Sequence, residues 1–350
     1  MKWRSYFLLP AVTIGLLLMG TSWLPSCDRS TDGGVFKSTD NGATWQQKNR
    51  ITDKENLNRA DILSLTVDPN NSQVIYIGVK EKGMYKSADA GESWRRVLPV
   101  DSNIHAIAVD AKDSNLVYAA SLAGTVGKVY KSPNAFEQTI EEILVDPRSG
   151  QALVDIVIDS YDSSRIYTIS EQGGIYKSND FGSTWAAKYW SKDELTRVRL
   201  SPTDSRVIYV STANTGLLKS IDGGETWVEI KDQLTKFKGG QKVADLEVLN
   251  NEIIYLATNY GLLKSITGGD SWESVPTLIA PEKVPITALT VDPTDSNIIY
   301  FSAASSIHKT VNSGKTWADW LLPTARQVSA LVLDPKMPET IYAGTIQVKK

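Results

Sequence analysis

The chain contains nearly the same eight residues seven times. Six clear copies are STDNGATW from Ser38, SADAGESW from Ser87, SNDFGSTW from Ser178, SIDGGETW from Ser220, SITGGDSW from Ser265 and TVNSGKTW from Thr310. A degenerate seventh copy, SPNAFEQT, begins at Ser132. We call each copy a box, and successive boxes start 42 to 49 residues apart. Such a repeat constrains the fold more than any local motif, because each unit must bury its apolar face against its neighbours.

The same order of segments recurs between boxes. In one unit, residues 62–68, 74–79, 83–87 and 93–97 form four short runs rich in β-branched and aromatic residues. Turn-forming Asp, Pro, Asn, Ser and Gly separate these runs, as expected for β-strands. Four strands repeated about every 45 residues are typical of the blades of a β-propeller.

The two ends of the chain indicate how many blades there are. Residues 328–334 and 340–344 read as first and second strands with no box after them. Residues 34–38 and the first box read as third and fourth strands with nothing before them. Joined, the two half-blades close a ring and hide its sheet edges. We therefore predict an all-β chain whose residues 34–350 form one seven-bladed propeller with four antiparallel strands per blade.

The box resembles the Asp-box, or bacterial neuraminidase repeat, of sialidases, sortilin-type receptors, some glycoside hydrolases and the photosystem II assembly and stability factor family. The resemblance implies a turn between the two outer strands of each blade, with the Asp accepting backbone N–H bonds and the Trp packing between blades. It assigns a structural role to Asp40, Asp89, Asp180, Asp222 and, in the Asp position of the last box, Asn312. The matching tryptophans are Trp45, Trp94, Trp185, Trp227, Trp272 and Trp317.

Residues 1–26 differ from the rest of the chain. Lys2 and Arg4 precede an apolar run that ends at Leu24, which is typical of an export signal. Leu24-Pro25-Ser26-Cys27 resembles a bacterial lipobox, although Pro25 departs from the family pattern. The resemblance implies lipidation of Cys27, cleavage before it, and a tether over residues 27–33. We expect the outer face of the cytoplasmic membrane, or the cell surface; a plain secretory signal or an uncleaved anchor are the alternatives.

Composition excludes several classes of function. Without Lys2 and Arg4 the formal net charge of −3 becomes −5, which disfavours general binding of nucleic acid. The chain has two histidines and one cysteine, too few for a transition-metal site or a Cys/His nucleophile pair. No phosphate-binding glycine loop precedes a helix. We therefore expect no metal and no cofactor, and a ring that is monomeric.

Charged residues interrupt the innermost strands of three successive blades. Asp155, Arg197 and Asp245 occupy one equivalent position, and Arg199 and Glu247 lie two residues further along. These strands line the central channel, so opposite charges are expected to face one another there. One interpretation is a site for a charged ligand; the other is a set of ion pairs between blades, because buried charges need partners.

The face opposite the boxes, which we call the loop face, carries the second-to-third strand turns and the connections between blades. Such loops hold functional residues on a rigid scaffold. Aromatic and basic residues gather in its longer segments, as in interface hot spots. The candidates are Tyr189, Trp190, Lys236, Phe237, Lys238 and Tyr260. The alternative is that these aromatic residues fold back onto the ring.

Two classes of function remain. The first is a non-catalytic, membrane-tethered module that binds protein partners and helps to assemble or stabilise an envelope complex. The second is a glycan-binding protein or glycoside hydrolase, with Asp155 and Asp245 as the paired carboxylates. The Arg-Ile-Pro signature of sialidases does not occur in the sequence. Arg197 between the two carboxylates would keep both ionised, which is unsuitable for a general acid.

Overall fold

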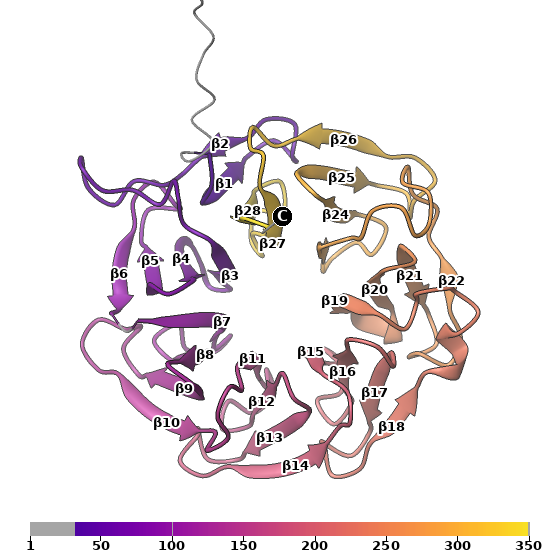
Figure 1. Ribbon diagram of the computed structural model, residues 1–350, viewed down its shortest axis with the longest axis horizontal. Helices are drawn as coiled ribbons and strands as arrows, with labels where there is room; N and C mark the ends of the chain where they lie inside the picture. The colour runs from indigo at the N-terminus through magenta and orange to yellow at the C-terminus, as the bar shows by residue number, and fades with distance from the viewer. Residues whose placement is uncertain (1–31, 100, 349–350) are drawn as a thin grey trace, which may run out of the picture.

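The computed structural model describes residues 32–99 and 101–348 and is a closed ring of seven four-stranded sheets (Figure 1). Each sheet is antiparallel, and its first strand lies next to the central axis. The predicted all-β, seven-bladed architecture is confirmed. The signal, Cys27 and the start of the tether lie outside the described residues. Within them, no helix is long and apolar enough to cross a membrane.

Each blade consists of four strands, ordered from the channel to the rim. Blade 1 is β27 (Gln327–Leu333), β28 (Ile341–Ile346), β1 (Val35–Ser38) and β2 (Gln46–Gln47); blade 2 is β3 (Ile62–Asp68), β4 (Asn71–Val79), β5 (Gly83–Ser87) and β6 (Arg95–Leu98). Blade 3 is β7 (Ser102–Val109), β8 (Val117–Ala123), β9 (Val126–Ser132) and β10 (Glu141–Val145); blade 4 is β11 (Leu153–Ile158), β12 (Ile166–Ser170), β13 (Gly174–Ser178) and β14 (Ala186–Trp190). Blade 5 is β15 (Leu195–Leu200), β16 (Ile208–Thr212), β17 (Leu217–Ser220) and β18 (Val228–Ile230); blade 6 is β19 (Val243–Val248), β20 (Ile254–Thr258), β21 (Leu262–Ser265) and β22 (Glu273–Ser274). Blade 7 is β23 (Ala288–Val291), β24 (Ile299–Ala303), β25 (Ser306–Thr310) and β26 (Ala318–Leu321), and two single-turn 3-10 helices, η1 (Asp232–Leu234) and η2 (Asn250–Glu252), lie in loops.

Blade 1 closes the ring by joining the two ends of the described chain, as predicted. Strand β28 pairs with β1 in antiparallel register, with Val35 opposite Gly344 and Ser38 opposite Ile341. The first described residues are also fixed on the loop face. The Asp32 carboxylate accepts the Ala325 N–H at 2.7 Å and lies 3.7 Å from the Arg326 guanidinium. The chain therefore enters the ring on the loop face.

The box forms the turn between the third and fourth strands. Asp40 accepts the backbone N–H of Thr44 at 2.8 Å and its hydroxyl at 2.6 Å. The Ser38 hydroxyl donates to Asp40 and accepts the N–H of Gly42, whose φ of 92° suits glycine. The bonds from the following Ser or Thr recur at Asp89, Asp180 and Asp222. Because Ser93 and Trp94 belong to this turn, the fourth strand of blade 2 begins at Arg95, not at residue 93.

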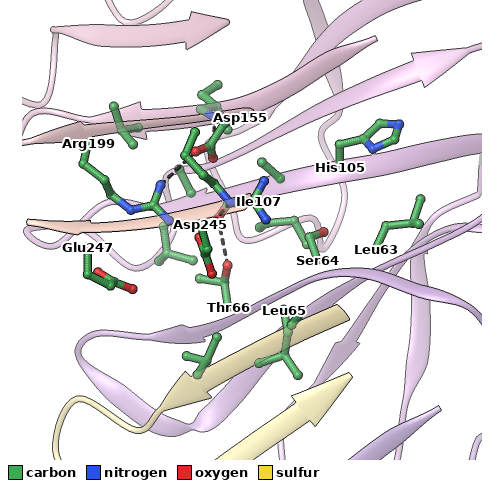
Figure 2. Close-up of a pocket in the computed structure, with 18 of the residues that line it drawn as sticks. Leu63, Ser64, Leu65, Thr66, His105, Ile107, Asp155, Arg199, Asp245 and Glu247 are labelled. Atoms are coloured by element: carbon green, nitrogen blue, oxygen red, sulfur yellow. Dashed lines mark hydrogen bonds and ion pairs between the residues drawn. The ribbon is translucent and has the colours of Figure 1, made fainter. Parts of the chain in front are cut away.

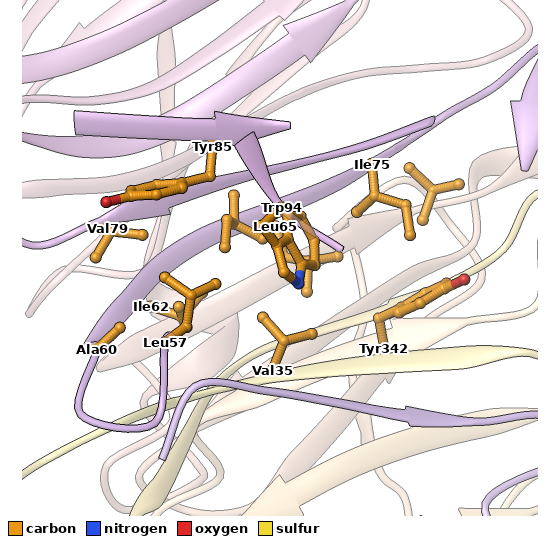
Figure 3. Packing of buried hydrophobic residues seen from close by; sticks show 12 residues of the cluster. Val35, Leu57, Ala60, Ile62, Leu65, Ile75, Val79, Tyr85, Trp94 and Tyr342 are labelled. Carbon is orange, nitrogen blue, oxygen red and sulfur yellow. The ribbon is translucent and has the colours of Figure 1, made fainter. Parts of the chain in front are cut away.

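Each box tryptophan packs with the preceding blade. Trp94 of blade 2 belongs to a buried cluster with Val35 and Tyr342 of blade 1 (Figure 3). Trp45, Trp185, Trp227, Trp272 and Trp317 are placed in the same way, each in or against a cluster that holds a buried tyrosine of the blade before it. In the degenerate box, Phe136 adopts a φ of 60° at the glycine position and joins the cluster of Tyr76. The Phe136 side chain thus occupies the inter-blade core where blade 3 lacks a tryptophan.

A tyrosine and a lysine of one blade bind the box of the next. The Tyr76 hydroxyl and the Lys86 ammonium both donate to the carbonyl of Ala135, at 3.4 and 3.2 Å. The lysine nitrogen also lies 5.6 Å from the centre of the Tyr76 ring. Tyr342 and Lys37 bind Ala90 in the same way. One tyrosine at the equivalent position of each blade is buried, and its hydroxyl binds the neighbouring blade: Tyr76, Tyr118, Tyr167, Tyr209, Tyr255, Tyr300 and Tyr342.

The box carboxylates should make the ring sensitive to acid. The Thr44 hydroxyl holds the pKa of Asp40 at about 2, below its ordinary value of 3.8, and Thr226 likewise lowers that of Asp222. A carboxyl group whose pKa is lower in the folded than in the unfolded chain stabilises the fold at pH values above its unfolded-state pKa. This stabilisation is lost as the pH falls through the folded-state pKa. We therefore expect the urea concentration at the unfolding midpoint to decrease as the pH is lowered from about 4 to about 2. The Asp222→Asn variant should show a shallower fall, and an unchanged slope would contradict this origin.

Candidate functional site

The structure brings the predicted candidates into three separate groups. The charged residues of the inner strands line the central channel, and we call Asp155, Arg197, Arg199, Asp245 and Glu247 the channel cluster (Figure 2). Trp190 lies at the end of β14 on the loop face. Phe237 and Tyr260 meet on the loop face of blades 5 and 6.

The channel holds two adjoining cavities. The larger, of about 360 Å³, is lined by the channel cluster and by apolar residues such as Leu65, Ile107 and Leu289. It reaches Ala111 and Ser160, in first-to-second strand turns, at the end of the channel where the boxes lie, which we call the box face. A second cavity of about 230 Å³ lies toward the loop face and includes Glu171 and Glu194.

Asp155 and Asp245 link neighbouring blades. The Asp155 carboxylate accepts the N–H groups of Ile156 and Val198, and Arg199 at 2.8 Å. Asp245 repeats this pattern two blades further along: it accepts the N–H groups of Leu246 and Leu289, and Arg197 at 3.1 Å. Each carboxylate therefore satisfies a backbone donor of the next blade and one guanidinium.

A β-bulge explains why these side chains point between blades. The register of the inner hairpin shifts just before Asp155, Arg197 and Asp245. The same shift precedes Ser64, whose hydroxyl donates to the carbonyl of Ile104 in the next blade. Such a bulge re-aims the side chain that follows it. Ion pairs between blades, one of the two interpretations of the sequence pattern, are thus present.

Glu247 differs from the two aspartates. Its carboxylate lines the large cavity, and it accepts no hydrogen bond from residues 32–99 or 101–348. Burial raises the pKa of Glu247 to about 7, and Arg199 opposes this shift only in part. His105 lines both cavities, and burial lowers its pKa to about 4, so its imidazole is neutral near pH 7.

The two channel aspartates have little capacity for acid and base chemistry. Asp155 and Asp245 each accept two backbone N–H bonds and pair with an arginine, so both oxygens of each carboxylate are engaged in contacts within the protein. Among the described residues, no three His, Cys, Asp or Glu side chains are arranged to hold a metal ion. The channel geometry is suited to holding blades together and to binding.

Trp190 is partly packed onto its own blade. Its ring meets Tyr176 edge-on at 5.8 Å, and the Arg148 guanidinium lies 3.9 Å from the ring centre. Arg148 is in turn held by the buried Asp146 carboxylate through two nitrogens. Trp190 keeps 48% of its surface exposed. Tyr189 packs against Trp227 at 6.1 Å, so it contributes to the outer core of blades 4 and 5.

Two of the remaining candidates, Phe237 and Tyr260, meet on the loop face beside the connection that holds Leu278 and Ile279, and we call these four residues the loop-face patch. The Phe237 and Tyr260 rings lie 5.2 Å apart, and Tyr260 and Ile279 line a pocket of about 150 Å³. Leu278, in the connection between β22 and β23, is 59% exposed. Lys236 donates to the Trp272 carbonyl at 2.8 Å, and Lys238 pairs with Glu282. The patch is apolar at its centre and charged at its edge.

Sequence analysis missed the connection that completes this patch. Residues 275–287 separate β22 from β23 and supply most of the lining of the pocket. The sequence did contain a signal for this connection. It is about as long as the other long loops of this face, and it contains Pro276, Pro281 and Pro285. Proline fixes φ and has no N–H to donate, so three prolines favour an irregular connection over a strand.

Comparisons with known proteins place this geometry among other propellers. No family model matches the sequence. The xyloglucanase Xgh74A of Acetivibrio thermocellus is 28% identical over 170 residues, which are 47% of this chain and 16% of the xyloglucanase. A xyloglucanase of Hypocrea jecorina is 29% identical over 170 residues, 17% of its length. The chain therefore spans less than a fifth of the curated relatives it matches.

Two solved structures have the same fold. A GH74 xyloglucanase from Xanthomonas campestris superposes with a TM-score of 0.66 and 18% identity, over 82% of this chain and 51% of that chain. YCF48 bound to D1 peptide superposes with a TM-score of 0.64 and 12% identity, over 83% of this chain and 94% of that chain. These likenesses show the fold alone. The neighbours thus include an enzyme and a propeller bound to a peptide.

Proposed function

We propose that this chain is a non-catalytic propeller that binds a protein partner through its loop face and is tethered to a membrane through Cys27. The observation that carries the proposal is the loop-face patch, where the exposed Leu278 lies in the loop that forms a pocket with Tyr260 and Ile279. Apolar anchors next to a small pocket, rimmed by charges, are the usual centre of a protein interface. The two channel aspartates are engaged in bonds between blades, which argues against catalysis.

The likeness to YCF48 supports the same conclusion. It extends over 94% of that chain, so a single ring of this size accounts for nearly the whole of a protein that was solved with a bound peptide. An assembly or stability factor for an envelope complex would need no more than such a ring and a tether. We transfer no particular partner from this neighbour to the present chain.

The tether would place the loop face near the bilayer. Asp32 is bound on that face, and it lies five positions along the chain from Cys27. An extended segment of that length spans at most about 18 Å. A lipidated Cys27 would therefore hold the loop-face patch close to the outer face of the cytoplasmic membrane. The partner we propose is a membrane protein or a protein bound at the membrane surface.

A photo-crosslinking residue at Leu278 tests this proposal in the native membrane. We expect one discrete crosslinked protein from position 278 and none from Ile221, which is 67% exposed at a box on the opposite face. The Tyr260→Ala variant should weaken capture about thirtyfold, as expected for a hot-spot residue. Its urea midpoint serves as the folding control. Capture from position 221 alone, or equal capture by both positions, would overturn the assignment of the loop face.

Glycan binding is the second candidate, and the sequence similarity to two xyloglucanases favours it. Half-exposed aromatic rings such as Trp190 are suited to stacking on sugars. Titration with xyloglucan oligosaccharides, with Trp190→Ala as the comparison, decides this point. Binding that is lost in Trp190→Ala, with no crosslinked protein at position 278, would replace the first proposal with this one.

A further inference from the structure

Among the described residues that line the large cavity, Glu247 is the one carboxylate that accepts no hydrogen bond and forms no ion pair within 4 Å. Arg199 already donates to Asp155 at 2.8 Å and to the Val198 carbonyl, and Arg197 pairs with Asp245 at 3.1 Å. These two ion pairs are neutral as a whole. Glu247 then gives the large cavity one unmatched negative charge whenever it is ionised. A ligand that neutralises it must be a cation.

The rest of the cavity is suited to a short hydrocarbon chain. Besides the cluster, its lining includes Leu65, Ile107, Ile156, Leu289 and Leu331, which are all nearly buried in the core. Its volume of about 360 Å³ is in the range of small-molecule sites. The cavity reaches the turns on the box face, and Glu247 lies one residue before the end of β19 on that side, so a cation can approach it from the box face.

We propose that the channel binds an alkylammonium group, as in a lysine side chain or an aliphatic diamine, with the nitrogen on Glu247 and the methylene groups along the apolar wall. This site is independent of the loop-face patch. A charged hydrogen bond to a carboxylate in a partly dry cavity is strong, since few waters compete with it.

Binding of a cation at this position must release protons. Burial keeps part of the Glu247 population protonated at pH 7, because its pKa is raised to about 7. The other charged groups that face it are Asp155, Arg197, Arg199 and Asp245, and His105 stays neutral in this pH range. Strands β3, β23 and β27 add only apolar and hydroxyl side chains to the lining. An ammonium group favours the ionised carboxylate, so binding releases protons wherever Glu247 is partly protonated.

Isothermal titration of the full chain, in a non-ionic detergent, with 1,5-diaminopentane tests the proposal. We expect binding that releases protons, measured from the difference in heat between phosphate and HEPES buffers, and that tightens from pH 6 to pH 8. 1-Pentanol, which has the same chain length without charge, should not bind. Glu247→Gln should weaken binding by about thirtyfold or more, as for loss of one member of a desolvated charge pair.

A matched variant separates this site from general attraction to an acidic protein. Glu229 is exposed on β18 and pairs with Lys231, so Glu229→Gln removes the same charge and should leave diamine binding unchanged. Three results would overturn the proposal. They are equal binding by Glu247→Gln, binding without proton release, and no binding at 10 mM diamine, which means a Kd weaker than roughly that concentration. If Glu247→Gln is unstable, proton release by the unmodified protein decides the question.

Discussion

Replacing Asp245 with alanine is expected to lower the free energy of unfolding by about 3–5 kcal/mol, as for breaking a buried ion pair on one side. The Asp245 side chain is 10% exposed, and its carboxylate accepts two backbone N–H groups, one of them from Leu289 in the next blade. Alanine would leave both donors and the Arg197 guanidinium without this acceptor. The midpoint and slope of urea unfolding, followed by tryptophan fluorescence, measure the loss.

Two further variants divide this effect into its parts. Arg197→Ala should cost less, because Asp245 keeps its two N–H donors and the arginine side chain is partly exposed. Asp245→Asn should fall between the two, since one amide oxygen replaces two carboxylate oxygens. A change of less than about 1 kcal/mol in Asp245→Ala, the size of one ordinary hydrogen bond, would show that the inter-blade link is not important for stability.

The bonds of the channel aspartates to neighbouring blades also affect how a ligand site in the channel can be tested. An aspartate that holds two blades together would lower stability when replaced, whether or not a ligand binds nearby. Glu247 accepts no such bonds among the described residues, so its replacement should change binding with little effect on stability. The two kinds of channel residue can therefore be separated by experiment.

The seven blades could be predicted because the repeat is local and strongly patterned. Each box specifies its own turn through contacts within a few residues, such as the bonds of Thr44 to Asp40. The two half-blades at the ends then determined the closure of the ring. The start of β4 at Asn71, earlier than residue 74, shows the limit: strand ends depend on pairing across the hairpin, here between Asp68 and Asn71.

Contacts between blades were harder to predict. A lysine precedes the first residue of every box, yet only the structure shows that five of these lysines bind the next box: Lys37, Lys86, Lys177, Lys219 and Lys309. The sequence shows the box that contains Phe136 only as degenerate. That the Phe136 side chain fills the inter-blade core in place of a tryptophan depends on the shape of the neighbouring core. The raised pKa of Glu247 likewise depends on burial in a cavity that residues of other blades line, which no local pattern reveals.

The sequence predicted only part of the candidate site, because contacts between loops, like contacts between blades, are not local. The sequence placed Phe237 and Tyr260 in loops of one face, and the structure brings their rings together. It did not indicate that Tyr189 would pack on Trp227, or that Arg148 would cover Trp190. Whether a loop side chain is exposed to solvent or packs on a neighbouring loop depends on how the loops pack together. The sequence alone does not determine that packing.

Tyr342→Ala is expected to destabilise the ring at its closure, by about 3–5 kcal/mol for removal of a large buried aromatic side chain. The Tyr342 side chain is fully buried, and its hydroxyl donates to Ala90 at 3.2 Å. Tyr342→Phe keeps the packing and loses this bond, so it should cost about 1 kcal/mol. Urea unfolding of the two variants separates packing from hydrogen bonding.

Tyr76→Ala provides the comparison, since Tyr76 holds the same position in blade 2 and is buried to the same extent. In blade 2 the chain runs from β4 directly into β5, whereas in blade 1 only hydrogen bonds and side-chain packing join β28 to β1. We expect similar losses of unfolding free energy but faster proteolysis of the C-terminal strands in Tyr342→Ala, because the ring can open there without unfolding elsewhere. Equal rates of cleavage in the two variants would show that closure is no weaker than the covalently continuous blades, and that the seven blades unfold as one unit.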